Sequence, residues 1–232
     1  PAVCSAPPSS TSAAHTPVCV ESNPVTGCIY VRDVAVASVY IYNEVGTFLR
    51  TVAPHGDLGT GWTPLGRAFD PGGRLYATDV KTANAHRVLM FAPDGTLTVS
   101  MGKAGALSFP NGIAVDAQGN VEVADSNNGR LVIFDRAGKM LASISGGEGG
   151  LGLPRGVAVG SAGRLYVVDS ANHQVRVYAI DPSAAEPAYI GAFGGEGQTD
   201  GRFEYPNGVA TDTRGHIYVA DRENGRVQVW GY

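Results

Sequence analysis

The stretch FPNGIAVDAQGNVEVADSNNGRLVIFDRAGKML, residues 109–141, alternates short apolar runs with tight-turn signals. Its apolar runs are rich in β-branched residues that alternate with small or polar ones, as residues of half-buried strands do. The turns between the runs carry glycine, which readily adopts the positive φ that tight turns require. The segment therefore predicts several short antiparallel strands joined by turns.

The same pattern returns twice more, as LPRGVAVGSAGRLYVVDSANHQVRVYAIDP at residues 153–182 and YPNGVATDTRGHIYVADRENGRVQVWGY at residues 205–232. Two weaker copies precede them, so that a proline marks the start of each unit near Pro17, Pro64, Pro110, Pro154 and Pro206. A repeat of about 45 residues is typical of a four-stranded propeller blade. We therefore expect an all-β chain, a β-propeller of about five units over residues 17–232, with the last blade incomplete in sequence.

Residues 1–16 are rich in Ser, Ala and Pro, which predicts a flexible or extended N-terminal arm. All three cysteines of the chain lie near its start, at Cys4, Cys19 and Cys28. We expect a disulfide that joins Cys4 to Cys19 or Cys28, and hence an exported protein in the periplasm, at the cell surface or outside the cell. The alternative is three reduced cysteines in a cytosolic protein.

Composition excludes several classes of function. The formal net charge of −4 and the pI of about 5.7 argue against a nucleic-acid partner, because phosphate binding needs an excess of Lys and Arg. No apolar run approaches the roughly 20 residues of a membrane-spanning helix. Hydrophobic residues make up 44% of the chain, which is enough for a core.

The letters of the repeat resemble the NHL repeat of β-propeller proteins. The resemblance rests on the P-x-G entrance, the strand GVAVD, the end YVAD of the second strand and the run N-x-R-V-Q-V, and it covers residues 17–232. It implies strands that run outward from a central axis, with the P-x-G entrance and the loop after the second strand at one end, the top. NHL-type propellers usually have six blades, whereas the repeat gives five units here. Because the fifth unit has only three strands, we expect the N-terminal arm or a protein partner to supply or cover the outer edge of the last blade. The alternative is an edge that stays short and exposed to water.

Residues that recur in every unit are expected to serve the blade itself. An aspartate ends each second strand, namely Asp33, Asp79, Asp125, Asp169 and Asp221. A row of carboxylates also suggests a metal site, but their recurrence favours hydrogen bonds to loop N–H groups of the same blade. Arg130 and Arg226 are expected to pair with these aspartates or with a neighbouring blade.

Residues that differ between units are better candidates for function. The variable position of P-x-G is Leu65, Asn111, Arg155 and Asn207, with Val18 as a weak first equivalent. We expect these side chains at the mouth of the central channel, where they would contact a small polar or anionic ligand or a partner. The alternative is a mouth filled with water.

Two enzyme families share the resemblance. Amidating lyases carry zinc-binding histidines where this chain has Asn111, Arg155 and Asn207, and calcium lactonases use an asparagine in a similar PNG strand. Asn111 and Asn207 fit the lactonase pattern only in part, because no suitable central Asp accompanies Glu21. We therefore expect no catalytic residue, no metal site and no cofactor, with Ca²⁺ as the alternative.

Loops peculiar to one unit are expected to recognise a partner. They contribute Trp62, Lys81, Asn84, His86 and His173. The alternative interpretation of Trp62 is that it packs between blades. The sequence as a whole favours a non-catalytic protein-interaction or assembly module that presents these loops at its top end. The alternative function is a metal-dependent propeller enzyme, either a lactonase-like hydrolase or an amidating-lyase-like protein, with its site at the top of the channel.

Overall fold

The computed structural model describes residues 17–33, 35, 37–52, 62–83, 85–145, 150–184 and 186–231, without the side chain of Val18. The chain forms two compact units, residues 1–106 and 107–232. Unit 1 contains two four-stranded sheets. The first consists of β1 (Pro17–Ser22), β2 (Ile29–Asp33), β3 (Ser38–Tyr42) and β4 (Phe48–Val52). The second consists of β5 (Pro64–Phe69), β6 (Leu75–Asp79), β7 (Arg87–Phe91) and β8 (Leu97–Met101).

Unit 2 contains three sheets and two short 3₁₀ turns. The third blade consists of β9 (Pro110–Val115), β10 (Val121–Asp125), the turn η1 (Ser126–Asn128), β11 (Arg130–Phe134) and β12 (Met140–Ile144). The fourth consists of β13 (Pro154–Gly160), the turn η2 (Ser161–Gly163), β14 (Arg164–Asp169), β15 (Gln174–Ala179) and β16 (Ala188–Gly194). The fifth consists of β17 (Gly208–Thr211), β18 (Ile217–Asp221) and β19 (Arg226–Trp230).

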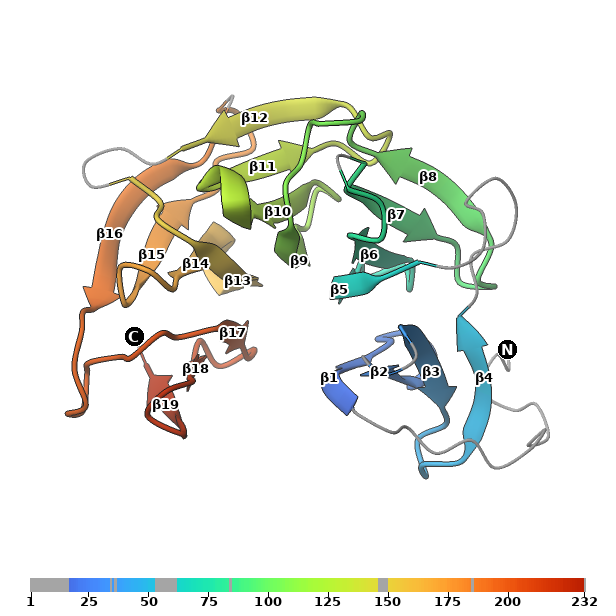
Figure 1. Cartoon of the computed structure of the whole chain (residues 1–232), viewed down its shortest axis with the longest axis horizontal. Coiled ribbons are helices and arrows are strands. Elements are labelled where there is room, and N and C mark those ends of the chain that lie inside the picture. The colour runs from blue at the N-terminus through green and yellow to red at the C-terminus, as the bar shows by residue number, and fades with distance from the viewer. Residues whose placement is uncertain are drawn as a thin grey trace. The chain divides into compact units, whose positions relative to one another are not determined.

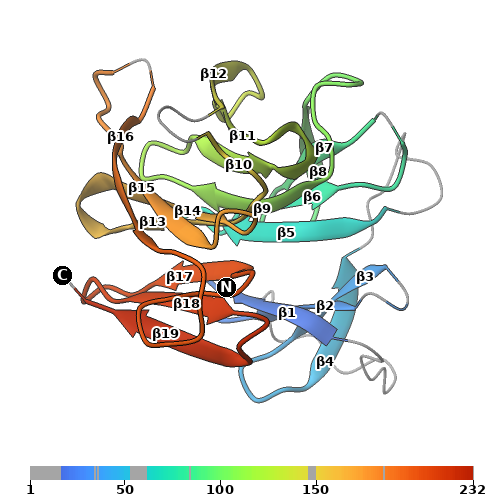
Figure 2. The same ribbon diagram turned by 60° about the vertical axis from the view of Figure 1, so that its left-hand side comes forward.

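Each sheet is a blade in which consecutive strands pair antiparallel in the order of the chain (Figures 1 and 2). Four blades have four strands, and the last has three within the described residues. The prediction of an all-β propeller with an incomplete last blade is thereby confirmed. Helix in the described residues is confined to the two 3₁₀ turns, and neither is long and apolar enough to cross a membrane.

The register explains why proline and aspartate recur together. The proline that begins the first strand lies directly opposite the aspartate that ends the second, as in the pairs Pro17–Asp33, Pro64–Asp79, Pro110–Asp125 and Pro154–Asp169. The start of a blade and the loop between its second and third strands therefore share one end, which we call the top end. The tight turns that follow the first and third strands lie at the bottom end.

Glycine in P-x-G allows neighbouring blades of unit 2 to approach each other at their first strands. A Cβ on Gly112 of β9 would collide with the carbonyl oxygen of Arg155 on β13. A Cβ on Gly156 would lie 2.8 Å from the backbone nitrogen of Val209 on β17. In Figure 1 β9, β13 and β17 accordingly lie nearest one another, with β12 and β16 at the periphery.

The core lies between the faces of adjacent blades. One cluster of buried side chains joins the third and fourth blades through residues such as Leu131, Val157 and Tyr178. Another joins the fourth and fifth through Val175, Phe203 and Val219. Each sheet thus buries apolar surface against its neighbour, at about 25 cal/mol per Å² of area removed from water.

Unit 1 has a core of its own, and this core contains Trp62. The indole is only 4% exposed and packs edge-to-face on Phe91 with ring centroids 5.6 Å apart. The assignment of Trp62 to a partner-binding loop is therefore wrong, and the alternative of a packing role is correct. An aromatic ring buried against other rings has no surface left for a partner.

The described part of the N-terminal region narrows the disulfide prediction. Cys19 is a free, half-buried thiol, so the pairing of Cys4 with Cys19 is wrong. Cys28 is fully buried within the core of unit 1. Cys4 and the rest of the arm lie outside the described residues, so the pairing of Cys4 with Cys28 stays a prediction.

Candidate functional site

The aspartates that recur at the end of each second strand tie the top end of the blade together. In all five the carboxylate accepts hydrogen bonds from backbone N–H groups of its own blade or of the loop that enters it. The donors are Ala35 to Asp33, Thr63 and Lys81 to Asp79, Ser108 to Asp125, Gly152 and Leu153 to Asp169, and Glu204 to Asp221. We call each such carboxylate with its donors an aspartate latch. Its role is structural, as the recurrence predicts.

Side chains complete the latches of four blades. Arg130 and Arg226 pair with Asp125 and Asp221 at 2.7 and 2.8 Å, which confirms their predicted partners. Arg87 and Arg176 do the same for Asp79 and Asp169. The sequence interpretation missed these two, although both stand at the start of the third strand or close to it.

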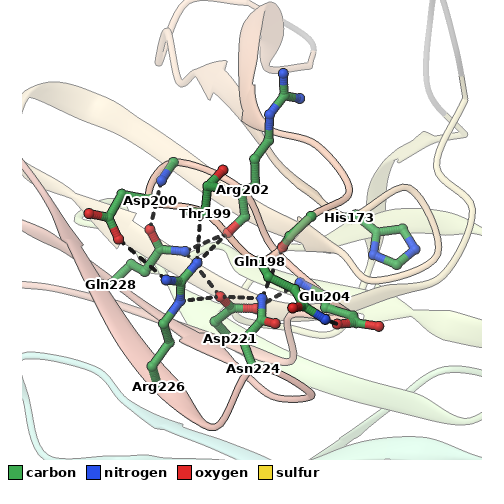
Figure 3. A network of polar contacts seen from close by, with 12 residues as sticks. His173, Gln198, Thr199, Asp200, Arg202, Glu204, Asp221, Asn224, Arg226 and Gln228 are labelled. Atoms are coloured by element: carbon green, nitrogen blue, oxygen red, sulfur yellow. Dashed lines mark hydrogen bonds and ion pairs between the residues drawn. The ribbon is translucent and has the colours of Figure 1, made fainter.

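The aspartate latch of the last blade also includes contacts with the loop that precedes β17 (Figure 3). Arg226 donates to the carbonyl oxygens of Thr199 and Arg202, and Gln228 donates to Arg202 and to Asp221. Burial alone would raise the pKa of Asp221, but hydrogen bonds from Glu204, Arg226, Asn224 and Gln228 together hold this pKa below its ordinary value. The loop of residues 199–204 is thus fixed against β19.

Two of the residues predicted at the channel mouth meet at the top end of unit 2. The guanidinium of Arg155 on β13 donates to Oδ1 of Asn111 on β9 at 3.0 Å. The amide nitrogen of Asn111 donates to the carbonyl of Phe109 and to the hydroxyl of Ser126. Because its amide is held on both sides, Asn111 presents its oxygen to Arg155 in a fixed orientation.

The guanidinium of Arg155 is also affected by the charge of a second arginine, Arg222. Partial burial lowers the pKa of Arg155, and the nearby charge of Arg222 lowers it further. Arg222 lies in the loop after β18 and forms an exposed ion pair with Glu223 at 3.1 Å. Asn207 is exposed and precedes β17. The top end of unit 2 therefore gathers two guanidinium groups and two amides.

Two aromatic residues at this end have an unusual backbone. Phe109 and Tyr205 each precede the proline of a P-N-G motif, have φ values of 54° and 46°, and are 40% and 49% exposed. Left-handed backbone at a bulky residue costs free energy and is found preferentially at functional sites. Sequence reasoning missed both residues, because nothing in the letters F-P and Y-P indicates a positive φ.

His173 supports Tyr205 instead of facing a partner. It is 8% exposed, its Nδ1 accepts a hydrogen bond from the backbone nitrogen of Tyr205, and the two rings lie 4.5 Å apart. The prediction of an exposed contact residue at His173 is therefore wrong, because the loop before β17 folds over the histidine.

The remaining predicted residues lie in unit 1. Leu65 is half-buried on β5, His86 is half-buried before β7, and Lys81 is exposed after β6. Asn84 lies outside the described residues, as does the side chain of Val18. Glu21, considered for calcium, has a pKa raised by burial against the lowering effect of Arg67. Within the described ranges no three His, Cys, Asp or Glu side chains come close enough to hold a metal ion.

Known structures confirm the class of fold. A chain of the nidogen/laminin complex matches with a TM-score of 0.70 at 22% identity, over 94% of this chain and 76% of that one. A streptogramin B lyase matches with a TM-score of 0.65 at 15% identity, over 93% and 68%. Virginiamycin B lyase from Staphylococcus aureus matches with a TM-score of 0.66 at 12% identity, over 94% and 71%. At such identities the likeness shows the fold alone, that of a β-propeller.

Sequence comparison identifies the repeats. The NHL repeat matches residues 107–134, 151–178 and 203–230, which lie in the third, fourth and fifth blades and end before β12 and β16. The chain therefore contains three NHL repeats. It is 28% identical to NHL repeat-containing protein 3 of Mus musculus over 131 residues, and 54% identical to the E3 ubiquitin-protein ligase TRIM71 of Xenopus tropicalis over 39 residues. The chain spans 38% and 5% of the length of these two relatives.

Proposed function

We propose that the chain is a non-catalytic protein-interaction module whose contact surface is the top end of unit 2. The carrying observation is the hydrogen bond between Arg155 and Asn111, which lies at the same end of unit 2 as the exposed rings of Phe109 and Tyr205. Arginine and aromatic residues are enriched among those that dominate binding energy at protein interfaces. The left-handed backbone at the two aromatic residues costs free energy. A role in fixing the two rings in place for a partner would explain this cost.

The chemistry of this surface specifies the kind of partner segment. The guanidinium groups of Arg155 and Arg222 favour a carboxylate, which arginine binds with two parallel hydrogen bonds. The rings of Phe109 and Tyr205 favour an apolar or aromatic side chain next to it. We therefore propose that the partner presents an acidic residue close to an apolar one. That one of the similar folds comes from a complex of two proteins supports a binding role.

Affinity capture with matched variants tests the proposal. Arg155→Glu and Tyr205→Ala are expected to lose most of the protein captured by the wild type, since both remove groups at the top end. Arg214→Ala, which removes an exposed arginine at the bottom end of the last blade, is the control and is expected to capture as the wild type does. Equal capture by all four proteins would contradict the proposal.

The last blade offers a second way to hold the same kind of partner. β19 is the final strand of its sheet in the described chain, and its Val227 and Val229 are 62% and 58% exposed. A partner that adds a strand beside β19 would pair its backbone groups and cover these side chains. Val229→Lys is expected to weaken such binding, as seen by loss of the captured protein, whereas Arg214→Ala again serves as the control.

A metal-dependent enzyme is the second candidate function, favoured by the fold that the chain shares with two lyases. Calorimetric titration with Ca²⁺ or Zn²⁺ separates the two candidates. Binding of one ion per chain that is lost in Asn111→Ala would support an enzyme.

We further propose that the protein is exported, and this proposal rests on the disulfide expected between Cys4 and Cys28.

A further inference from the structure

One position of the blade changes its chemistry in the third blade alone. The residue three positions before the latch aspartate is a tyrosine in the other four blades, Tyr30, Tyr76, Tyr166 and Tyr218, and it is Glu122 on β10. Three of these tyrosines and Glu122 pair with an alanine of the neighbouring first strand, so they are structurally equivalent. The signal is present in the sequence as NVEVAD against RLYVVD and HIYVAD.

In the second and fifth blades an aspartate begins the bottom turn, and the tyrosine hydroxyl lies close to its carboxylate. The hydroxyl of Tyr218 donates to Asp212 at 3.1 Å, and that of Tyr76 lies 3.5 Å from Asp70. The equivalent aspartate of the third blade is Asp116, whose two carboxylate oxygens accept from the backbone and side chain of Asn120. Glu122 thus places a carboxyl group where the other blades place a hydroxyl donor.

Glu122 is buried and incompletely bonded. Its side chain is 1% exposed, and its Oε2 atom has no hydrogen-bond partner. Burial raises the pKa of Glu122 well above its ordinary value, and the charge of Asp116 raises it further. A buried carboxyl oxygen without a partner is costly, so its retention requires an explanation.

Beside Glu122 lies a pocket of about 290 Å³ between the bottom ends of the third and fourth blades. Its polar lining consists of Asp116, Gln118, Asn120, Glu122, Asp181 and Glu186, and it contains no basic side chain. Ile133, Leu141, Ile180 and two prolines form its apolar walls. Arg136 lies over Gly119 of the bottom turn and does not belong to the lining. The pocket thus combines oxygen acceptors, negative charge and an apolar wall.

We propose that this pocket binds an organic cation, a guanidinium or primary ammonium group on an apolar stem, with Oε2 of Glu122 as its acceptor. The donors of such a group match the carboxylate and amide oxygens, and a guanidinium has the fork geometry that carboxylates accept. The stem lies along Ile133, Ile180 and Pro182. The site is at the opposite end of the strands from the proposed partner surface, so the two proposals are independent of each other.

The proposed binding has a pH dependence of defined sign. A cation binds the ionised form of Glu122, whose pKa is raised. Affinity therefore increases as pH rises through this pKa, and binding releases a proton in that range. Asp181 has a pKa lowered by hydrogen bonds from Ser183, so it is already ionised there.

Calorimetric titration of the full chain with agmatine and with N-acetyl-arginine amide tests the proposal. The first probe represents a small-molecule cation and the second an arginine side chain of a peptide. We expect one of them to bind with a dissociation constant below about 1 mM, and the tighter one identifies the source. Glu122→Gln is expected to weaken binding at least tenfold. The control Glu196→Gln, at an exposed residue that does not line the pocket, is expected to bind as the wild type does.

Glu122→Tyr restores the residue that the other blades carry. It is expected to fill the pocket, abolish binding of both probes and raise the midpoint of thermal unfolding. Failure of both probes to bind the wild type below 1 mM would overturn the proposal, as would equal binding by wild type and Glu122→Gln. An affinity that does not change with pH would also overturn it.

Discussion

Arg176 and Asp169 form an ion pair at 3.3 Å although the side chains of both are almost entirely buried. The same carboxylate holds Asn172 and the backbone of Gly152 and Leu153. Asp169→Ala leaves the buried guanidinium without its carboxylate, although Arg176 still donates to the carbonyl oxygen of Gly150. We expect a loss of about 3–5 kcal/mol in the free energy of unfolding. Urea denaturation measures this loss. Asp200→Ala removes an exposed carboxylate paired with Arg226 and is expected to cost less than about 1 kcal/mol.

Gly112 and Gly208 occupy the same place in their repeats but differ in their surroundings. A Cβ on Gly112 would overlap the backbone of Arg155, whereas a Cβ on Gly208 would meet only the Cβ of Ala220 at 3.6 Å. Gly112→Ala is therefore expected to lower the free energy of unfolding by about 1–3 kcal/mol, and Gly208→Ala to leave it within about 0.5 kcal/mol. Equal effects of the two changes in urea denaturation would show that the close approach of β9 and β13 is not what requires glycine.

The backbone of Phe109 makes glycine preferable to alanine at this position. At a φ of 54° a Cβ costs roughly 1–2 kcal/mol, so Phe109→Gly is expected to be more stable than Phe109→Ala by about 1 kcal/mol. Both variants are expected to lose the partner, because both lack the ring. If alanine proves as stable as glycine in denaturation experiments, the left-handed backbone at Phe109 carries no strain.

Glu122 is expected to lower stability as pH rises. The unfolded chain ionises this carboxyl near its ordinary pKa of about 4.3, whereas the folded chain keeps the proton to higher pH because burial raises the pKa. The folded state then binds more protons, so the free energy of unfolding falls between the two pKa values and levels off above the higher one. Glu122→Gln removes this decline, and the difference between the two proteins cancels titrations that they share. A difference that stays constant between about pH 4 and 8 would contradict the raised pKa.

The cysteine assignment predicts how many thiols react. With Cys19 free and Cys4 joined to Cys28, denatured protein that has not been reduced is expected to show one reactive thiol per chain, and reduced protein all three. Cys19→Ser is expected to abolish the reaction before reduction. Three thiols without reduction would contradict the disulfide, and with it the argument for export.

The fold could be predicted from the sequence because its determinants are local and repeated. Alternation at a period of two sets the strands, glycine sets the turns, and the repetition sets the number of blades. The proximity of Asn111 to Arg155 could also be predicted, because both occupy the same position in neighbouring units. The aspartate latches followed from recurrence alone.

The surroundings of single residues could not be predicted in the same way. Trp62 and His173 stand in connecting segments, and their burial depends on how those segments fold over neighbouring strands. The left-handed backbone of Phe109 and Tyr205 arises from the tertiary fold and leaves no mark in their side-chain type. Glu122 is different, because the sequence itself shows a glutamate where the other blades have a tyrosine.

The aspartate latches are each completed by groups of their own blade and of the loop that enters it. Rewriting the exposed residues of one loop therefore leaves the anchoring of the others untouched. Such a chain is suited to grafting, in which foreign recognition segments replace the residues between a latch aspartate and the arginine that completes it, one blade at a time.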